Sequence, residues 1–254
     1  GFGVLAGTGI GFGCSSATPP ALKWFPPAKT GMIAGIVVSG FGLASVYIAP
    51  LVSWLLRTQG LHTSMLIFGV AFALLVSVLS AFLKNPPKGY VPGASGAASA
   101  ANAAAPAAVN KSAKEIVRTG SFWILWSIYF VGAGAGLMVI GSVAGMAKAS
   151  LGEMAFVAVA LMAVGNAAGR IVAGVLSDRI GRLQTLFFML AFQAVLMFVA
   201  IPVVGRGGAV VLVLLASAIG FNYGTNLALF PSIAKDFWGM KNFGVNYGVL
   251  FTAW

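Results

Sequence analysis

Arg170 is the one charged residue that lies well inside an apolar segment of this sequence. A charge in hydrocarbon is costly, so such a residue normally faces a cavity or a charged partner. Asn166 lies four residues earlier and therefore on the same helical face. An amide and a guanidinium that point into one cavity would bind a carboxylate, because arginine can hold one through two parallel hydrogen bonds. A structural arginine whose side chain snorkels toward the membrane surface is the alternative.

Three further residues are candidates for contact with the same ligand. Tyr223 and Asn226 stand three residues apart in a later apolar segment, and Tyr129 lies near the start of an earlier one. A buried polar residue in a membrane helix more often bonds a neighbouring helix than a ligand. Helix packing therefore stays open as the role of each.

A compact charged turn follows Arg170 and forms the pattern G-x-x-x-D-R-x-G-R. Its defined positions are Gly174, Asp178, Arg179, Gly181 and Arg182. Asp178 can pair with a basic group or with a helix N-terminus across a gap, and the glycines permit close approach and a tight turn. Such a latch would hold one state of a gate. A solvated basic turn that only sets the membrane topology is the alternative.

The composition is that of a membrane protein with several spans. The chain is 59% hydrophobic and 7% charged, whereas a soluble domain has about 25% charged residues. Its net charge of +11 is spread over short loops and forms no patch, which argues against a nucleic-acid partner. With one cysteine, one histidine and four acids, the sequence predicts no metal site, no cofactor and no catalytic residue.

Eight apolar segments predict an all-α membrane protein. They lie at about 1–20, 31–56, 63–83, 121–146, 154–176, 183–204, 209–230 and from 243 onward. Pro19-Pro20 and Pro231 are expected to end the first and seventh segments, and Arg57 to His62 to form a loop. The chain begins without Met inside one apolar run and stops at Trp254 inside another. We therefore expect an internal piece of a longer protein.

Residues 84–120 separate two helical parts, 1–83 and 121–254. The middle of this stretch is rich in Ala, Gly, Ser and Pro, which predicts a flexible linker, and its end, KSAKEIVRTG, suits an interfacial helix. Eleven of the 15 basic residues fall in the set of alternate loops that includes this linker, and three fall in the other set. The positive-inside rule then places the linker in the cytoplasm and the chain in a cell membrane, for which a bacterial inner membrane is expected.

Several motifs together resemble a known family. The turn Gly174 to Arg182, placed between two apolar segments, is similar to the loop signature of the major facilitator superfamily. The runs GTGIGFG, PPALKWFPPAKTG and KNFGVNYGVLFTAW resemble the oxalate/formate antiporter family within it, which is itself similar to monocarboxylate transporters. That family has G-R-x-x-x-G-x-x-S-D-x-x-G-R in its eighth helix, matched by Gly169 to Arg182. Its eleventh helix has N-Y-G-x-x-F-T-A, matched by Asn246 to Ala253.

The resemblance implies a major facilitator fold of two six-helix halves, truncated here at both ends, in which the eight segments are helices four to eleven. It also implies that Arg170 is the carboxylate-binding cation of a carrier that works by alternating access. Oxalate carriers of the family have a lysine just after T-A, where this chain has Trp254. One cation in place of two fits a monoanion such as formate, lactate or pyruvate, because a second carboxylate would stay unpaired. Trp254 either lines the cavity or only packs.

The sequence leaves other functions open. A dicarboxylate antiporter of the oxalate/formate type and a transporter-like sensor without flux both remain compatible with these motifs. A selectivity filter and an intramembrane nucleophile–base pair are both missing from the sequence, which disfavours a channel and an enzyme. A seven-helix receptor is disfavoured by the latch motif. The expected partners are a small organic anion, the lipid bilayer and either protons or a counter-anion.

Overall fold

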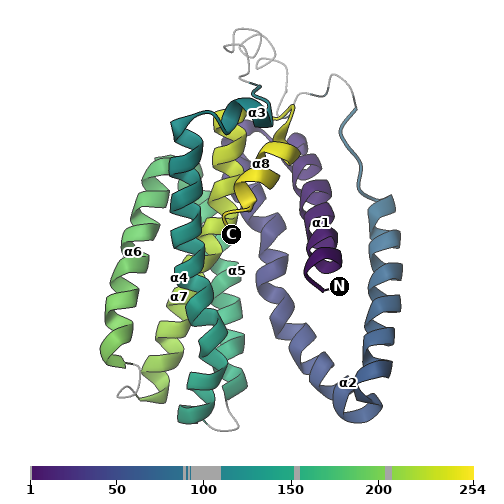
Figure 1. The fold of residues 1–254 in the computed structure, drawn as a ribbon, viewed down its shortest axis with the longest axis vertical. Coiled ribbons are helices and arrows are strands. Elements are labelled where there is room, and N and C mark those ends of the chain that lie inside the picture. Colours follow the sequence, from purple (N-terminus) through teal and green to yellow (C-terminus); the bar gives the residue numbers. More distant parts are fainter. Residues whose placement is uncertain (1, 88–89, 91, 93–109, 152–154, 204–207) are drawn as a thin grey trace.

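The computed structural model describes residues 2–87, 90, 92, 110–151, 155–203 and 208–254. All of the regular secondary structure within these residues is helical. This confirms the all-α fold expected from the sequence. The helices are α1 (Phe2–Trp24), α2 (Thr30–Ala81), α3 (Ala113–Ile116), α4 (Gly120–Leu151), α5 (Ala155–Ile180), α6 (Arg182–Val203), α7 (Ala209–Trp238) and α8 (Phe243–Phe251), with a 3-10 turn at Pro27–Lys29. Figure 1 shows α4, α5, α6 and α7 as one bundle, with α1 and α2 beside it.

The long helix α2 is two apolar arms joined at a glycine. Gly60 has φ 71° and ψ 175°, a conformation outside the helical region. Positive φ is open to glycine because it has no Cβ, and the chain reverses direction there (Figure 1). The two arms correspond to the segments expected at 31–56 and 63–83. The loop expected from Arg57 to His62 is wrong in extent, since the helical assignment continues on both sides of Gly60.

Two prolines that were expected to end helices lie inside them. Pro19 and Pro20 are within α1, which continues to Trp24, and Pro231 is within α7, which continues to Trp238. Long helices tolerate proline where neighbouring helices and hydroxyl side chains compensate for the lost backbone bond.

The α5 helix is central because it packs closely against α7 on one side and α2 on the other. A Cβ atom at Gly165 of α5 would lie 2.5 Å from the carbonyl oxygen of Ser217 in α7, and one at Gly42 of α2 would lie 2.8 Å from the Ala167 nitrogen. Only hydrogen fits at these contacts, so the helix backbones touch. Small residues on both faces of α5 therefore bring α2 and α7 to the two sides of Arg170.

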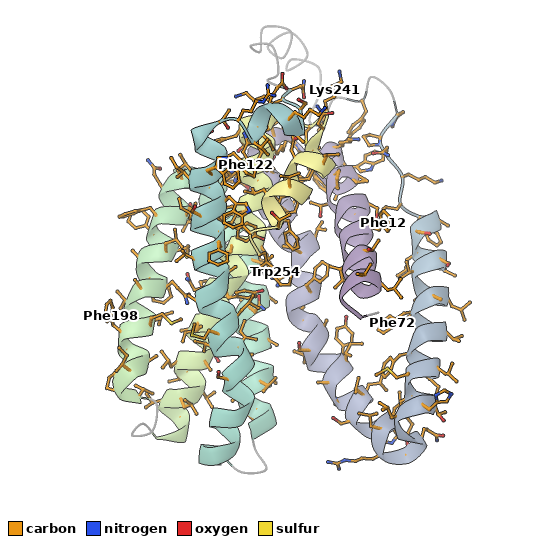
Figure 2. The ribbon with its side chains drawn as sticks, in the orientation of Figure 1. Phe12, Phe72, Phe122, Phe198, Lys241 and Trp254 are labelled. Atoms are coloured by element: carbon orange, nitrogen blue, oxygen red, sulfur yellow. The ribbon has the colours of Figure 1, made fainter. Side chains whose placement is uncertain are left out.

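The outer faces of the bundle are apolar. Within the part of the chain that the structure describes, five helical stretches are long and apolar enough to cross a membrane: Pro27–Ala81, Gly120–Ser142, Val157–Ile180, Arg182–Val203 and Val210–Trp238. Phe198 on α6 points away from the bundle in Figure 2. Such a surface suits hydrocarbon, where backbone groups are satisfied within each helix.

The stretch before α4 that was expected to form an interfacial helix contains the short helix α3. Ser112 and Glu115 form its capping box: the Ser112 backbone N–H donates to the Glu115 carboxylate at 2.6 Å, and the Ser112 hydroxyl donates to it at 2.8 Å. The expected flexible linker falls mostly on residues 93–109, which lie outside the described residues.

Candidate functional site

A cavity of about 270 Å³ lies where α1, α2, α4, α5, α7 and α8 meet. Most of its wall is apolar, as at Val38, Phe41 and Leu137. Its polar lining comes from Thr18, Asn166, Arg170, Tyr223, Tyr247 and Trp254. A volume near the lower end of the usual range for ligand pockets suits a small ligand. An apolar wall with a few polar groups is the arrangement expected of a binding site.

Arg170 is 2% exposed and is held from two helices. Its Nε donates to Oδ1 of Asn166 at 3.0 Å, one turn earlier on α5. A terminal guanidinium nitrogen donates to the backbone carbonyl of Val38 on α2. The two acceptors orient the guanidinium without neutralising it, because an amide oxygen and a carbonyl oxygen carry only partial charge.

The electrostatics of the cavity favour an anion. Among the described residues that line it, Arg170 is the only charged one. A carboxylate is the group that a planar guanidinium binds best, through paired hydrogen bonds. The described lining therefore suits an anion.

Tyr223 and Trp254 are joined across the cavity wall. The Trp254 Nε1–H donates to the Tyr223 hydroxyl oxygen at 2.6 Å. The Trp254 ring also stacks on Phe251, with ring centroids 5.1 Å apart, while Tyr223 packs on Gly136 of α4, where a Cβ would meet its ring. Figure 2 shows Trp254 beside the C-terminal end of α8, facing the middle of the bundle. The structure thus brings both residues to the cavity that Arg170 lines.

Two other candidates lie elsewhere. The Tyr129 ring is fully buried and stacks on Phe230 with ring centroids 4.0 Å apart. Asn226 is 2% exposed, and a Cβ at Gly132 of α4 would lie 3.2 Å from its Oδ1. Neither residue is part of the cavity lining. Both sit at the contact between α4 and α7, the packing position that the sequence left open for them.

Sequence reasoning missed three polar contributors to the cavity and its surroundings. Tyr247 lies within the N-Y-G motif, and that motif was a sufficient signal to include it. Thr18 lies just before the two prolines of α1 and is 5% exposed. The Val38 carbonyl that accepts from Arg170 could not be found from sequence, because every residue has a carbonyl and only the packing of α2 on α5 selects this one.

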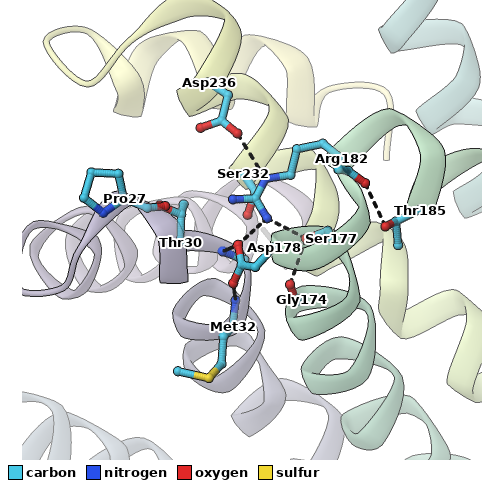
Figure 3. A network of polar contacts seen from close by, with 12 residues as sticks. Pro27, Thr30, Met32, Gly174, Ser177, Asp178, Arg182, Thr185, Ser232 and Asp236 are labelled. Carbon is cyan, nitrogen blue, oxygen red and sulfur yellow. Dashed lines mark hydrogen bonds and ion pairs between the residues drawn. The ribbon is translucent and has the colours of Figure 1, made fainter. Parts of the chain in front are cut away.

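The latch residues form a polar network at the C-terminal end of α5. The two carboxylate oxygens of Asp178 accept hydrogen bonds from the backbone N–H groups of Gly31 and Met32, at 2.9 and 2.8 Å (Figure 3). These N–H groups open α2 and have no partner within the helix. The positive end of the helix dipole also favours a carboxylate at this position.

Arg182 extends this network to α7. It forms an ion pair with Asp178 at 2.5 Å and another with Asp236 of α7 at 3.0 Å (Figure 3). Its guanidinium also donates to the Ser177 hydroxyl at 2.6 Å. The beginning of α2, the end of α5 and the end of α7 are therefore tied by one set of charges. Asp236 was not singled out from sequence.

The remaining latch positions differ in their roles. Gly174 faces Gly31, and a Cβ at Gly31 would lie 2.4 Å from the Gly174 carbonyl oxygen, so the two helices touch there. Gly181 has φ 99° and makes the turn between α5 and α6, a conformation that suits glycine. Arg179 is exposed at the end of α5. Lys235 of α7 adds a hydrogen bond to the start of α2, since its ammonium donates to the Thr30 hydroxyl.

Comparison with known proteins gives a family match over the whole chain. The family described as the Major Facilitator Superfamily matches residues 1–254. The chain is 31% identical to an uncharacterized MFS-type transporter, YhjX, of Escherichia coli strain K12, with 98% of this chain and 60% of the relative covered. It is 28% identical to the oxalate:formate antiporter of Oxalobacter formigenes, with 98% and 58% covered.

A third relative comes from a eukaryote. The chain is 25% identical to the apicoplast pyruvate carrier 1 of Toxoplasma gondii, with 98% of this chain and 55% of that protein covered. The chain therefore spans somewhat more than half the length of these relatives.

Proposed function

The chain belongs to the major facilitator superfamily, and on that basis we propose that it is part of a secondary transporter that carries small monocarboxylate anions by alternating access. The observation that carries the proposal is the environment of Arg170, a buried guanidinium in a small cavity whose described lining contains no acid. A transported carboxylate would accept paired hydrogen bonds from this guanidinium. The names of two relatives, an oxalate:formate antiporter and a pyruvate carrier, support a carboxylate as the substrate class.

A monoanion is preferred to a dianion because the described residues that line the cavity include one cation, Arg170. Trp254 is neutral and lines the cavity at the position where the resemblance places a lysine in oxalate carriers. The second carboxylate of oxalate would lose its hydration without gaining a counter-charge, which is unfavourable. An oxalate/formate-type antiporter and a sensor without flux are the competing functions, and the experiment below separates them.

The positions of the cavity and the latch fit a rocking mechanism. We assign the described segments to helices four to eleven of the fold, so that α1 and α2 belong to one half and α4 to α8 to the other. The cavity then lies between the halves. The bonds from Gly31 and Met32 to Asp178 hold α2 against α5 at the end next to the linker. Opening that end requires these bonds to break, so the latch would stabilise the state closed there.

The excess of basic residues in one set of loops supports a cytoplasmic position for residues 84–120 and for the latch. The protein would then be a multi-pass protein of a cell membrane, such as a bacterial inner membrane. Exchange against a second anion and symport with protons both fit this arrangement. A labelled-substrate assay with and without an imposed pH gradient distinguishes them.

The test is counterflow in proteoliposomes that contain the full-length protein, with labelled formate, lactate and oxalate. Arg170→Gln removes the charge, and Arg170→Lys keeps it without the planar fork. Arg57→Gln is the matched control, because it makes the same change at an exposed position of α2 outside the cavity. We expect monocarboxylate exchange that falls about 100-fold in Arg170→Gln, partly recovers in Arg170→Lys and is unchanged in Arg57→Gln.

Each contrary result has a distinct meaning. Oxalate exchange as fast as lactate exchange contradicts the one-cation argument. Wild-type exchange by a well-folded Arg170→Gln variant makes Arg170 a structural residue. No exchange of any of the three acids contradicts the transport function and favours the sensor.

A further inference from the structure

The hydrogen bond between Trp254 and Tyr223 fixes which of the two can donate to a ligand. An indole N–H can only donate, so the Tyr223 oxygen is the acceptor of their 2.6 Å bond. The hydroxyl hydrogen of Tyr223 must then point away from Trp254. In the described part of the chain, no protein acceptor is assigned to this hydrogen, although Tyr223 is 5% exposed and lines the cavity.

The orientation of Tyr223 is set on both sides of its ring. Gly136 of α4 lies against the ring, since a Cβ there would come 2.5 Å from Cδ2, and Trp254 holds the hydroxyl. A ring that is packed and bonded in this way loses little further freedom when it binds a ligand. Tyr223 is thus a preorganised neutral donor in the same small cavity as Arg170, the one cation among the described lining residues.

From this geometry we propose that Tyr223, positioned by Trp254, selects monocarboxylates with an uncharged oxygen on the neighbouring carbon, namely 2-oxo and 2-hydroxy acids. The inference rests on the proposed carboxylate transport and specifies its substrate. Arg170 takes the carboxylate, and the Tyr223 hydroxyl donates to the keto or hydroxyl oxygen. The apolar wall formed by residues such as Val38 and Leu137 takes the alkyl end.

The same arrangement disfavours other small acids for separate reasons. Propionate has nearly the size of pyruvate but carries a methylene group where pyruvate has its keto carbonyl group, so the Tyr223 hydroxyl would be left without an acceptor. Formate has no keto or hydroxyl oxygen besides its carboxylate oxygens. Oxalate offers one, but its second negative charge meets a neutral donor rather than a cation. A site that donates to a substrate oxygen discriminates strongly against analogues that lack it.

The experiment compares pyruvate with propionate in proteoliposomes of the full-length protein. Labelled pyruvate uptake gives its apparent KM, and inhibition by unlabelled propionate gives the affinity of the analogue. Tyr223→Phe removes only the hydroxyl, and Trp254→Phe removes the indole N–H together with the five-membered part of the ring system. The controls Tyr47→Phe and Trp123→Phe make the same chemical changes at exposed positions that do not line the cavity.

We expect the wild type to prefer pyruvate to propionate and Tyr223→Phe to reduce this preference about tenfold, mainly through weaker pyruvate binding. Trp254→Phe reduces it less, because the hydroxyl remains but is no longer oriented. The double variant has the preference of Tyr223→Phe alone, since Trp254 acts through Tyr223. A residue with only a structural role would weaken both acids equally and leave the preference unchanged.

The contrary outcomes separate this inference from the proposed function. Pyruvate transport with an unchanged preference in Tyr223→Phe overturns the selection by Tyr223 and leaves carboxylate transport standing. Equal affinity of the wild type for pyruvate and propionate also overturns the selection by Tyr223 and leaves carboxylate transport standing. Absence of uptake of both pyruvate and formate by a folded wild-type protein overturns the proposed function and this inference with it.

Discussion

Arg170 and Asn166 lie one turn apart on α5, and the Arg170 Nε donates to Oδ1 of Asn166 at 3.0 Å. The amide therefore holds the guanidinium by one edge, and the Val38 carbonyl of α2 accepts from one of its terminal nitrogens. Because the α2 acceptor belongs to the backbone, the orientation of Arg170 depends on the packing of α2 against α5. A movement between these helices would change the binding group directly.

Replacing Asn166 by Asp should inactivate the site without unfolding it. The new carboxylate would pair with Arg170 at the position of the present 3.0 Å bond and supply the charge that a substrate otherwise brings. We expect substrate affinity to fall at least about tenfold, while the melting temperature in detergent stays equal or rises. Asn166→Ala removes the acceptor without adding charge, and it should lower both the substrate affinity and the melting temperature. The idea is wrong if Asn166→Asp transports like the wild type.

Replacing Asp178 by Asn should loosen the contact between α2 and α5. The neutral side chain keeps one acceptor oxygen for the N–H groups of Gly31 and Met32, and it loses the ion pair to Arg182. The Ala34 side chain is 0% exposed in α2, so a cysteine there, in a Cys14→Ser background, reports opening. We expect thiol labelling at position 34 to increase about tenfold, as for a loss near 1.4 kcal/mol.

Asp236→Asn is the comparison for that experiment. The Asp236 side chain is 41% exposed, whereas that of Asp178 is 10% exposed. An exposed ion pair contributes little to stability, so labelling should change less than in Asp178→Asn. Equal labelling of the wild type and Asp178→Asn would show that the Asp178 bonds do not hold this end closed.

Adding a methyl group at Gly169 should destabilise the fold. A Cβ there would lie within 3.0 Å of the Phe221 backbone of α7, which cannot move aside as a flexible side chain could. We expect Gly169→Ala to lower the free energy of unfolding by about 1–3 kcal/mol. Gly134→Ala is the control, because no atom lies within 4 Å of its Cβ position and alanine is the better helix former. Thermal unfolding in one detergent measures both, and equal melting temperatures would refute the close contact.

The capping box of α3 should weaken in acid. Hydrogen bonds from the backbone N–H and then the hydroxyl of Ser112 lower the pKa of Glu115 from its ordinary value of 4.5. A lowered folded-state pKa stabilises α3 above pH 4.5, and this contribution is lost as the pH falls through the folded-state value. Hydrogen exchange at Ile116 and Val117, corrected for intrinsic rates, should show less protection below that range. Glu115→Gln should show no such pH dependence.

The helical positions and the candidate cation could be predicted from sequence because each depends on local pattern. Long apolar runs predicted the segments now seen as α1, α2 and α4 to α8. The isolation of Arg170 in such a run singled it out, and the spacing of Asn166 placed the two on one face. The helix ends were less predictable. Pro19, Pro20 and Pro231 break isolated helices, yet packing within the bundle lets α1 and α7 continue past them.

What the sequence determined by itself was the membrane-spanning helical class, the family resemblance and the short list of residues that could bind an anion or form a latch. The tertiary structure decided which of them meet. It placed Tyr223 and Trp254 at the Arg170 cavity and put Asn226 and Tyr129 at the contact between α4 and α7. It also joined Asp178 to the start of α2, 146 residues away from Met32 in the chain. The physical reason is that side-chain type and spacing are local properties, whereas a cavity and a helix-end bond require backbones from distant segments to approach closely.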